Sequence, residues 1–290
     1  MSQVERGSQP ASRFIMVTGA LGGIGRATVV RLADAGHAVF AADRRAGDNL
    51  TALAAEHRRV RPVVLDVTDA ASIESAREQI GTETGGYGLD VLVNAAGILV
   101  LGPVEAVPDE QTRAQFEVNL FGSLAVTRAF LPQMRQRGRG RVVNVSSILG
   151  QFALPGSGVY SASKFALEAV SDALRMELAP FGVRVVLVEP GVIDTPLYRR
   201  AATSLSAYDQ ALQPYRSSWP AGFEFPDRLM KSAAPVDGIA ATLVRAALVP
   251  SPRARYRLGM RNRVNTRLLT TLPTRSSDWF KTRIAGVAEP

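Results

Sequence analysis

The chain has 290 residues, of which 46% are hydrophobic and 21% charged, so it is long enough to bury a large core. It contains no cysteine, which excludes disulfides, thiolate metal ligands and a cysteine nucleophile. Its two histidines, His37 and His57, lie far from any serine elbow motif, which argues against a Ser-His-Asp hydrolase and a multi-histidine metal site. No apolar run reaches the ~18 residues of a membrane span, and the polar start lacks a signal-peptide core. We therefore expect a cytoplasmic protein without a metal.

The net charge of +8 is unevenly distributed along the chain. Residues 250–290 carry nine basic side chains against Asp278 and Glu289, which leaves residues 1–249 at +1. A strongly basic protein would prompt a search for nucleic acid or an anionic membrane as partner. Here any electrostatic partner belongs to the tail, and we expect the tail to have no direct bearing on the chemistry of the main domain.

From residue 14 onwards, short valine-rich stretches that are apolar on both faces alternate with longer stretches of helical period. The predicted strands are Phe14–Val17, Ala38–Ala41, Pro62–Leu65, Val91–Val93, Arg141–Val145 and Val183–Val188, with Arg255–Leu258 as an edge strand. The predicted helices are Gly23–Ala35, Asn49–His57, Ala70–Ile80, Asp109–Gln136, Ser157–Pro180 and Val236–Leu248. This alternation predicts a doubly wound parallel sheet of the Rossmann type, a three-layer α/β/α single domain.

The flanking segments complete the predicted organisation. Residues 1–12 are expected to form a flexible tail, and residues 13–258 a dinucleotide-binding catalytic domain. Residues 195–231 are rich in aromatic residues among proline and serine, which suits a lid over a site, although padding of the domain edge is an open alternative. Residues 259–290 form a basic extension in which Val264, Leu268 and Leu269 have the spacing of an amphipathic helix.

A glycine-rich turn follows the first predicted strand. Gly19, Gly23 and Gly25 have the spacing G-x3-G-x-G, which differs from the better-known G-x-G-x-x-G. Glycine is needed where the backbone turns sharply and approaches a pyrophosphate held at a helix N-terminus. The strand before and the helix after favour such a dinucleotide site over an ordinary tight turn. The residues assigned to the site here are Thr18, Gly19, Leu21, Gly23, Ile24 and Gly25.

The end of the second predicted strand bears on the choice between NAD and NADP. Asp43 stands there, 18 residues after Gly25. A carboxylate at this place accepts hydrogen bonds from the adenosine ribose and repels a 2′-phosphate. Arg44 and Arg45 follow and could instead hold that phosphate, but Gly22 is not basic, which removes one phosphate partner. We expect NAD to be favoured, with NADP left open.

Small and polar residues follow the third and fourth predicted strands. The carboxyl edge of a parallel sheet is where ligands bind, and small residues let a flat ring lie close to the backbone. Each of these positions could also be a plain strand-to-loop turn. The cofactor-binding candidates at this edge are Asp66, Val67, Asn94, Ala95, Ala96 and Gly97.

A serine, a tyrosine and a lysine form the candidate chemical group. Ser147 is followed 13 residues later by Tyr160 and four after that by Lys164. At i and i+4 of a helix, the phenol and the ammonium share one face. A phenol with a reference pKa of ~10 is a poor base at neutral pH, and a nearby ammonium favours its phenolate. Tyr160 is therefore the candidate acid/base, and the neighbouring Ser146 is predicted to point the other way.

These motifs, taken in order, resemble the short-chain dehydrogenase/reductase family in its single-domain form. The resemblance runs from about residue 13 to 258. The stretch PGSGVYSASKFALE is similar to the branch of the 17β-hydroxysteroid and retinol dehydrogenases. The chain departs from the family's usual NNAG by having Ala95. The motifs that carry the resemblance are Thr18, Gly19, Gly23 and Gly25, NAAG at 94–97, Asn119, Ser147, Tyr160 with Lys164, and Pro190 with Gly191.

The resemblance implies roles for individual residues. Tyr160 would exchange a proton with an alcohol or ketone, Ser147 would hold the substrate oxygen, and Lys164 would lower the Tyr160 pKa and hold the nicotinamide ribose. Asn119 would keep a water behind Lys164 as a proton relay. Residues bordering the nicotinamide would be Pro190, Gly191, Val192 and Thr195.

We therefore expect an oxidoreductase that transfers a hydride between NAD(P) and a secondary alcohol or ketone. Leu149, Phe152 and Leu154, near the catalytic group, favour a lipophilic, steroid- or retinoid-like substrate, although they could equally be core. The alternative is a catalytically weak, dinucleotide-sensing regulatory protein. We expect a homodimer or homotetramer and no nucleic acid partner, and peripheral membrane contact through the basic tail is left open.

Overall fold

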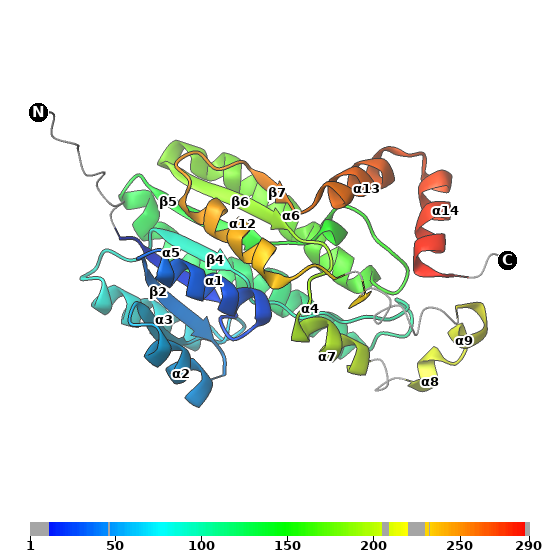
Figure 1. The fold of residues 1–290 in the computed structure, drawn as a ribbon, viewed down its shortest axis with the longest axis horizontal. Coiled ribbons are helices and arrows are strands. Elements are labelled where there is room, and N and C mark those ends of the chain that lie inside the picture. Colours follow the sequence, from blue (N-terminus) through cyan, green and yellow to red (C-terminus); the bar gives the residue numbers. More distant parts are fainter. Residues whose placement is uncertain (1–11, 46, 205–208, 220–229, 232, 288–290) are drawn as a thin grey trace, which may run out of the picture.

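Seven parallel strands form one sheet in the order β3-β2-β1-β4-β5-β6-β7 (Figure 1). The structure is a computed structural model that describes residues 12–45, 47–204, 209–219, 230–231 and 233–287. The strands are β1 Phe14–Thr18, β2 Ala38–Asp43, β3 Val60–Val64, β4 Val91–Asn94, β5 Gly140–Val145, β6 Val183–Glu189 and β7 Arg255–Arg257. They agree with the predicted strands to within two residues at each end. Pro62 is tolerated in β3 because this is an edge strand.

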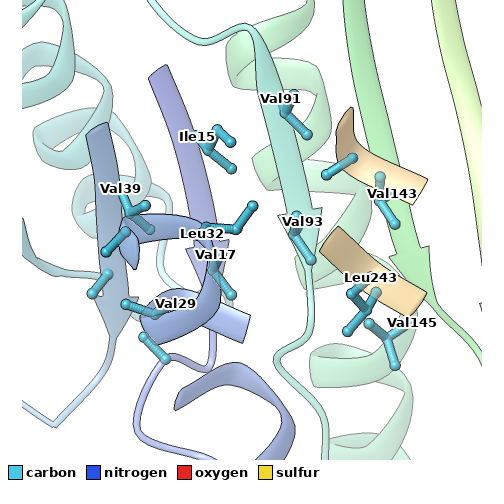
Figure 2. Packing of buried hydrophobic residues seen from close by; sticks show 14 of the residues in the cluster. Ile15, Val17, Val29, Leu32, Val39, Val91, Val93, Val143, Val145 and Leu243 are labelled. Atoms are coloured by element: carbon cyan, nitrogen blue, oxygen red, sulfur yellow. The ribbon is translucent and has the colours of Figure 1, made fainter. Parts of the chain in front are cut away.

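Alternate residues of each strand pack on opposite faces of the sheet. In β1, Ile15 and Val17 belong to one hydrophobic cluster and Met16 to the other. The first face is covered by α1 Gly23–Asp34, α2 Asp48–Glu56 and α12 Val236–Leu248, and the second by α3 Ala70–Glu83, α5 Ser123–Gln136 and the end of α6 Gly158–Leu178. Figure 2 shows Val29 and Leu32 of α1 and Leu243 of α12 against valines of four strands. The predicted three-layer α/β/α Rossmann-type domain is confirmed.

The predicted single helix Asp109–Gln136 is wrong in its middle. The chain forms α4 Asp109–Phe116, then a π-helical segment Glu117–Gly122, and then α5. A Cβ on Gly122 would lie 2.7 Å from Val67 Cγ2, so this stretch passes very close to the loop after β3. A π-turn accommodates one extra residue per turn, and such turns are frequent at functional sites. Asn119 lies in this segment and is fully buried.

The second half of the chain adds short helices beyond the sheet. Within the predicted lid 195–231 the structure has α7 Pro196–Ser204, α8 Asp209–Leu212 and α9 Tyr215–Ser218. The predicted lid aromatics Tyr208, Phe223 and Phe225 lie outside the described residues. The extension forms α13 Met260–Thr271 and α14 Thr274–Ala285, which confirms the helix expected around Val264. In Figure 1 both lie at one end of the molecule, beyond β7.

Candidate active site

The glycine turn lies at the carboxyl ends of β1 and β4. Gly19 has φ +65°, which only glycine adopts without strain, and a Cβ there would lie 2.9 Å from Ala96 Cα. A Cβ on Gly25 would lie 2.1 Å from the carbonyl oxygen of Gly19, so the start of α1 sits directly on the turn. Thr18 Oγ1 fixes the neighbouring loop because it accepts hydrogen bonds from the N–H groups of Ala95 and Ala96, both at 3.0 Å.

This turn fits a dinucleotide pyrophosphate. The N-cap of α1 is Gly22, no side chain caps the first turn, and that turn carries no acidic residue. The helix therefore presents its first N–H groups and its positive dipole end to the sheet edge without a competing carboxylate. Leu21 and Ile24 are half-buried and pack against the core of the first face, which anchors the turn from below.

Asp43 is held firmly at the end of β2. Its carboxylate accepts hydrogen bonds from the Leu21 N–H at 3.0 Å and from Arg45 Nε at 3.0 Å. Burial pushes the pKa of Asp43 up, but the hydrogen bonds from Arg45 and Leu21 outweigh it and keep the pKa below its usual value. Asp43 is therefore an anion beside the turn. The pKa of Asp66 is lowered, chiefly by hydrogen bonds from Thr68 to its carboxylate and to a smaller degree by the charge of exposed Arg44.

The loop after β4 divides into a core part and an edge part. Asn94 does not face the edge: its amide donates to Thr127 Oγ1 at 3.0 Å and Asn144 Oδ1 at 2.9 Å, so its side chain ties β4 to β5 and α5. The predicted contact between the Asn94 side chain and the cofactor is therefore wrong, because a buried amide needs hydrogen-bond partners and this one finds them inside the core. Gly97 does face the site, since a Cβ there would lie 3.9 Å from Lys164 Nζ.

The turn after β6 approaches the glycine turn from the other side. A Cβ on Gly23 would lie 2.7 Å from Thr195 Cγ2, so these two predicted cofactor residues are in contact range. The Pro190 carbonyl accepts a hydrogen bond from the Ile148 N–H at 3.0 Å, and the Val192 carbonyl accepts one from the Ala234 N–H, also at 3.0 Å. The predicted nicotinamide border therefore lies beside the Ser147 loop.

The charge distribution led us to expect that the C-terminal segment would be remote from the site. The structure shows that it is not. A Cβ on Gly191 would lie 2.5 Å from Asn262 Nδ2, so α13 packs directly on the predicted nicotinamide border. Arg255 and Arg257 also turn inward: Arg255 Nε lies 3.2 Å from a Glu168 carboxylate oxygen, and Arg257 pairs with Glu189. Part of the basic charge of the tail therefore balances buried carboxylates of the main domain.

Ser147, Tyr160 and Lys164 come together beneath this border. Ser147 follows β5 by two residues, and its hydroxyl accepts a hydrogen bond from the Leu149 N–H at 3.1 Å. Tyr160 and Lys164 lie one turn apart on α6, with Lys164 Nζ 5.8 Å from the centre of the phenol ring. Lys164 Nζ donates to the Val145 carbonyl at 3.0 Å, which fixes the ammonium against β5. All three side chains are buried.

The pKa of Tyr160 does not shift in the expected direction. Burial raises it to about 12, although a hydrogen bond with Ser147 acts to lower it. Burial also lowers the pKa of Lys164 to about 8, against the attraction of the Glu168 carboxylate, which raises it. Desolvation penalises both charged forms, and it exceeds the attraction between groups about one helical turn apart. The net shift of the Tyr160 pKa is therefore upward, whereas stabilisation of the phenolate by Lys164 stays a prediction.

Asn119 is tied to the same centre through its amide. Its Oδ1 accepts a hydrogen bond from the Ile98 N–H at 2.9 Å, and its Nδ2 donates to Ser163 Oγ at 3.1 Å. The π-turn that carries Asn119 is thus bonded both to the loop after β4 and to α6 between Tyr160 and Lys164. The expected proton relay remains a prediction.

Glu168 is a functional candidate that the sequence reasoning missed. It lies one turn after Lys164 on α6 and is 5% exposed. It accepts hydrogen bonds from Gln151 Nε2 at 3.1 Å and from Arg255 Nε at 3.2 Å, and burial raises its pKa to about 7. Ser146 also faces Glu168, as expected for a side chain opposite to Ser147. The sequence could have indicated Glu168, because an acidic residue four positions after Lys164 shares its face of a mostly apolar helix.

Apolar side chains enclose the phenol of Tyr160. Leu149 is among them, as predicted, whereas Phe152 is buried outside this group and Leu154 packs with Trp219, Ala285 and Val287. Leu99 and Leu101, which follow β4, were missed because they lie far from Tyr160 in sequence. The members on α7 lie within the predicted lid 195–231; they are Leu197, Tyr198 and Ala201. Burial raises the pKa of Tyr198, so a second neutral phenol borders the site.

A dinucleotide-binding turn next to a buried serine, tyrosine and lysine defines the site of a nicotinamide-dependent oxidoreductase. Residues 13–205 match the model of the short chain dehydrogenase family, and the chain belongs to that family. None of the described helices combines the length and the apolar character needed to cross a membrane. Among the same residues, no group of three or more acidic or histidine side chains is placed to hold a metal.

Several relatives are similar over much of the chain. A 3-ketodihydrosphingosine reductase of Bacteroides thetaiotaomicron is 40% identical over 63% of this chain and 65% of its own length. An NADPH-dependent 3-dehydrocapnine reductase of Ornithobacterium rhinotracheale is 33% identical over 92% of this chain and 95% of its own. Retinol dehydrogenase 5 of Mus musculus is 38% identical over 72% of this chain and 64% of its own length.

Solved structures agree with the fold. A short-chain dehydrogenase from Streptomyces avermitilis has a TM-score of 0.74 and 32% identity, and the match covers 94% of this chain and 97% of that one. A short chain dehydrogenase from Burkholderia cenocepacia, solved in complex with NADP, has a TM-score of 0.71 and 28% identity over the same shares.

Proposed function

We propose that this protein oxidises a secondary alcohol, or reduces the corresponding ketone, with NAD(P) and with Tyr160 as the acid/base. The observation that carries the proposal is the placement of buried Ser147, Tyr160 and Lys164 at the same sheet edge as the uncapped start of α1. A protein that only senses a dinucleotide has no use for a phenol and an ammonium buried one turn apart beside that edge.

Each residue has one task in this proposal. Tyr160 takes the proton of the alcohol, or gives one to the ketone oxygen, and Ser147 donates a hydrogen bond to that oxygen as its charge develops. Lys164 stabilises the phenolate and holds the ribose beside Gly97. When bound, the nicotinamide accepts a hydride from the carbinol carbon or returns one to the carbonyl carbon. The neutral, apolar surroundings of Tyr160 exclude water from this exchange.

The preferred cofactor in this proposal is NAD. Asp43 is an anion at the end of β2, and Arg45, the basic residue nearest to it, is already bonded to its carboxylate. A 2′-phosphate placed there would be repelled by the carboxylate, and Arg45 would not be available to bind it. NADP is the competing outcome. The relatives include an NADPH-dependent reductase and a structure solved with NADP, and the exposed Arg44 could bind the 2′-phosphate.

The substrate in this proposal is lipophilic. Leu99, Leu101 and Leu149 pack in one apolar cluster with the phenol ring of Tyr160. Desolvating an apolar substrate here is favourable at roughly 25 cal/mol per Å² buried. The relatives include a retinol dehydrogenase and a 3-ketodihydrosphingosine reductase, whose names point to lipid-like substrates.

The test is a turnover panel with the purified full chain. NAD and NADP are each offered with matched pairs of alcohols that share the reacting carbinol but differ in alkyl length, and with the corresponding ketones. We expect kcat/KM to rise with chain length and to be higher with NAD. Tight dinucleotide binding without turnover of any alcohol or ketone would favour the sensor instead, and an Asp43→Ser variant with unchanged preference would remove the cofactor argument.

We also propose that the chain forms a homodimer or homotetramer through α5 and α6. Phe121, just before α5, is 51% exposed, and Phe165 on α6 is 43% exposed. Exposed aromatic residues near two long helices are typical of protein interfaces. Light scattering of the purified chain tests this, and a monomeric mass at micromolar concentration would contradict it.

A further inference from the structure

The outer faces of α13 and α14 carry large apolar side chains that the fold leaves uncovered. On α13, Val264 is 56% and Leu268 45% exposed, one helical turn apart. On α14, Trp279 is 47%, Phe280 40% and Ile284 43% exposed. Single exposed apolar residues are ordinary, but two successive helices that each carry a stripe of them are not.

The opposite faces of the same two helices are buried, so their orientation is fixed. Thr266 and Leu269 of α13 are buried, as are Ser277 and Ala285 of α14. Ser277 Oγ donates to the Leu269 carbonyl at 2.7 Å, which joins the two helices. We call α13 and α14 together the C-terminal helix pair. Its apolar stripes face outward because the opposite faces of both helices are buried against the rest of the chain.

The helix pair is also positively charged. Residues 260–285 contain six basic side chains and one acidic one, Asp278, a net charge of +5. Arg267, Arg275 and Arg283 are exposed, and the Arg283 guanidinium lies 4.8 Å from the centre of the Trp279 ring. Aromatic and aliphatic side chains mixed with cations on one helix are the composition of helices that lie in the headgroup region of a membrane.

The pair borders the substrate side of the site. The Trp219 indole N–H donates to the Ala285 carbonyl at 2.9 Å, and Leu154 packs on both. Leu154 lies on the loop between Ser147 and Tyr160, so one face of α14 packs on the loop that joins these two site residues, while the other face carries Trp279 and Phe280. Figure 1 shows α13 and α14 at the end of the molecule, away from α1, α2 and α3.

We propose that the C-terminal helix pair docks the protein on an anionic lipid bilayer, with Trp279, Phe280 and Ile284 inserted among the headgroups. A second copy of the chain is a poorer occupant, since a symmetric contact would bring two positively charged helix pairs together. Docking places the loop between Ser147 and Tyr160 near the bilayer, from which a lipophilic alcohol or ketone would enter. Only this last consequence rests on the proposed function.

The test is co-sedimentation of the full chain with phosphatidylcholine vesicles, with and without phosphatidylglycerol, in the absence of substrate. We expect binding at least about tenfold stronger with phosphatidylglycerol, weakening as salt is raised, because each basic residue near an anionic surface contributes to binding. The triple variant Trp279→Ser, Phe280→Ser, Ile284→Ser should lose about tenfold or more. The double variant Arg267→Gln, Arg275→Gln should lose only the phosphatidylglycerol dependence.

Controls separate this proposal from its alternatives. Met176→Ser removes a side chain that is 66% exposed on α6 and should leave vesicle binding unchanged. All variants should keep the melting temperature and the turnover of a short, water-soluble ketone. No vesicle binding, unchanged binding of the triple variant, a smaller oligomer in that variant, or salt-sensitive binding to a duplex oligonucleotide in place of vesicles would each overturn the proposal. None of these outcomes depends on whether a lipophilic substrate is turned over.

Discussion

The catalytic edge of the sheet and the substrate side beyond it are built in different ways. Ser147 and Lys164 are held by backbone groups next to β5, and Tyr160 lies on the same helix as Lys164. The substrate side depends instead on side chains from distant segments, such as Trp219 against Ala285. Backbone-anchored groups move little when a side chain changes, whereas packed segments adjust. The chemistry should therefore be insensitive to changes on the substrate side, and substrate choice should depend on them.

The largest effect is expected at Lys164. Lys164→Met keeps the volume of the side chain but removes the ammonium that stabilises the phenolate, so kcat/KM should fall about 10³-fold for every substrate. The control is Lys281→Met, which removes another of the few lysines and only an ion pair with Asp278 at 3.5 Å. Equal activities of the two variants would contradict a role of the Lys164 ammonium in catalysis.

A smaller, pH-dependent effect is expected at Glu168. Below about pH 7 the carboxyl is largely protonated, because burial raises its pKa to about 7, so Glu168→Gln should match the parent protein there. Above that pH the parent gains an anion that raises the Lys164 pKa and the variant does not. The alkaline limb of ketone reduction should therefore move to lower pH in the variant.

The matched control for this profile is Asp172→Asn. Asp172 also pairs with Arg255, but it lies two turns beyond Lys164 and is half exposed. Its removal should leave the alkaline limb where it is. A shift of the same size in Asp172→Asn would assign the effect to the general charge of the cluster and not to Glu168.

The smallest effect is expected at Trp219. Trp219→Phe removes the hydrogen bond to the Ala285 carbonyl, worth about 1 kcal/mol, and loosens the packing of Leu154 on the loop between Ser147 and Tyr160. KM for a lipophilic ketone should rise about fivefold with kcat unchanged, and a short ketone should be unaffected. Trp279→Phe, at an exposed position, is the control. A drop in kcat for the short ketone would show that the two regions are coupled.

Much of the catalytic edge could be predicted because its signals are local. The glycine turn, Tyr160 with Lys164, and the strand boundaries depend on spacings of a few residues within one element. Asn94 shows the limit, since its position at a strand end says nothing about which way its amide turns, and neighbouring Thr127 and Asn144 decide that. The π-helical segment that contains Asn119 likewise packs closely on Val67 at Gly122, a contact that no helical period reveals.

The substrate side could not be predicted because its contacts are long-range. Asn262 packs on Gly191, and Ala285 on Trp219, across more than sixty residues of sequence. A count of charges separates the tail from the main domain, yet Arg255 and Arg257 return to Glu168 and Glu189. The direction of the Tyr160 pKa was missed for a related reason, since spacing shows the ammonium but not the depth of burial.

The most direct test of the account is the rate of hydride transfer in Tyr160→Phe. The variant keeps the ring that fills the apolar pocket and loses only the hydroxyl that exchanges the proton. In single-turnover experiments with NAD and a lipophilic secondary alcohol, we expect the rate to fall by about 10²–10⁴-fold while the Kd for NAD stays within about twofold. A Tyr160→Phe variant that transfers hydride at the parent rate would contradict the assignment of Tyr160 as the acid/base.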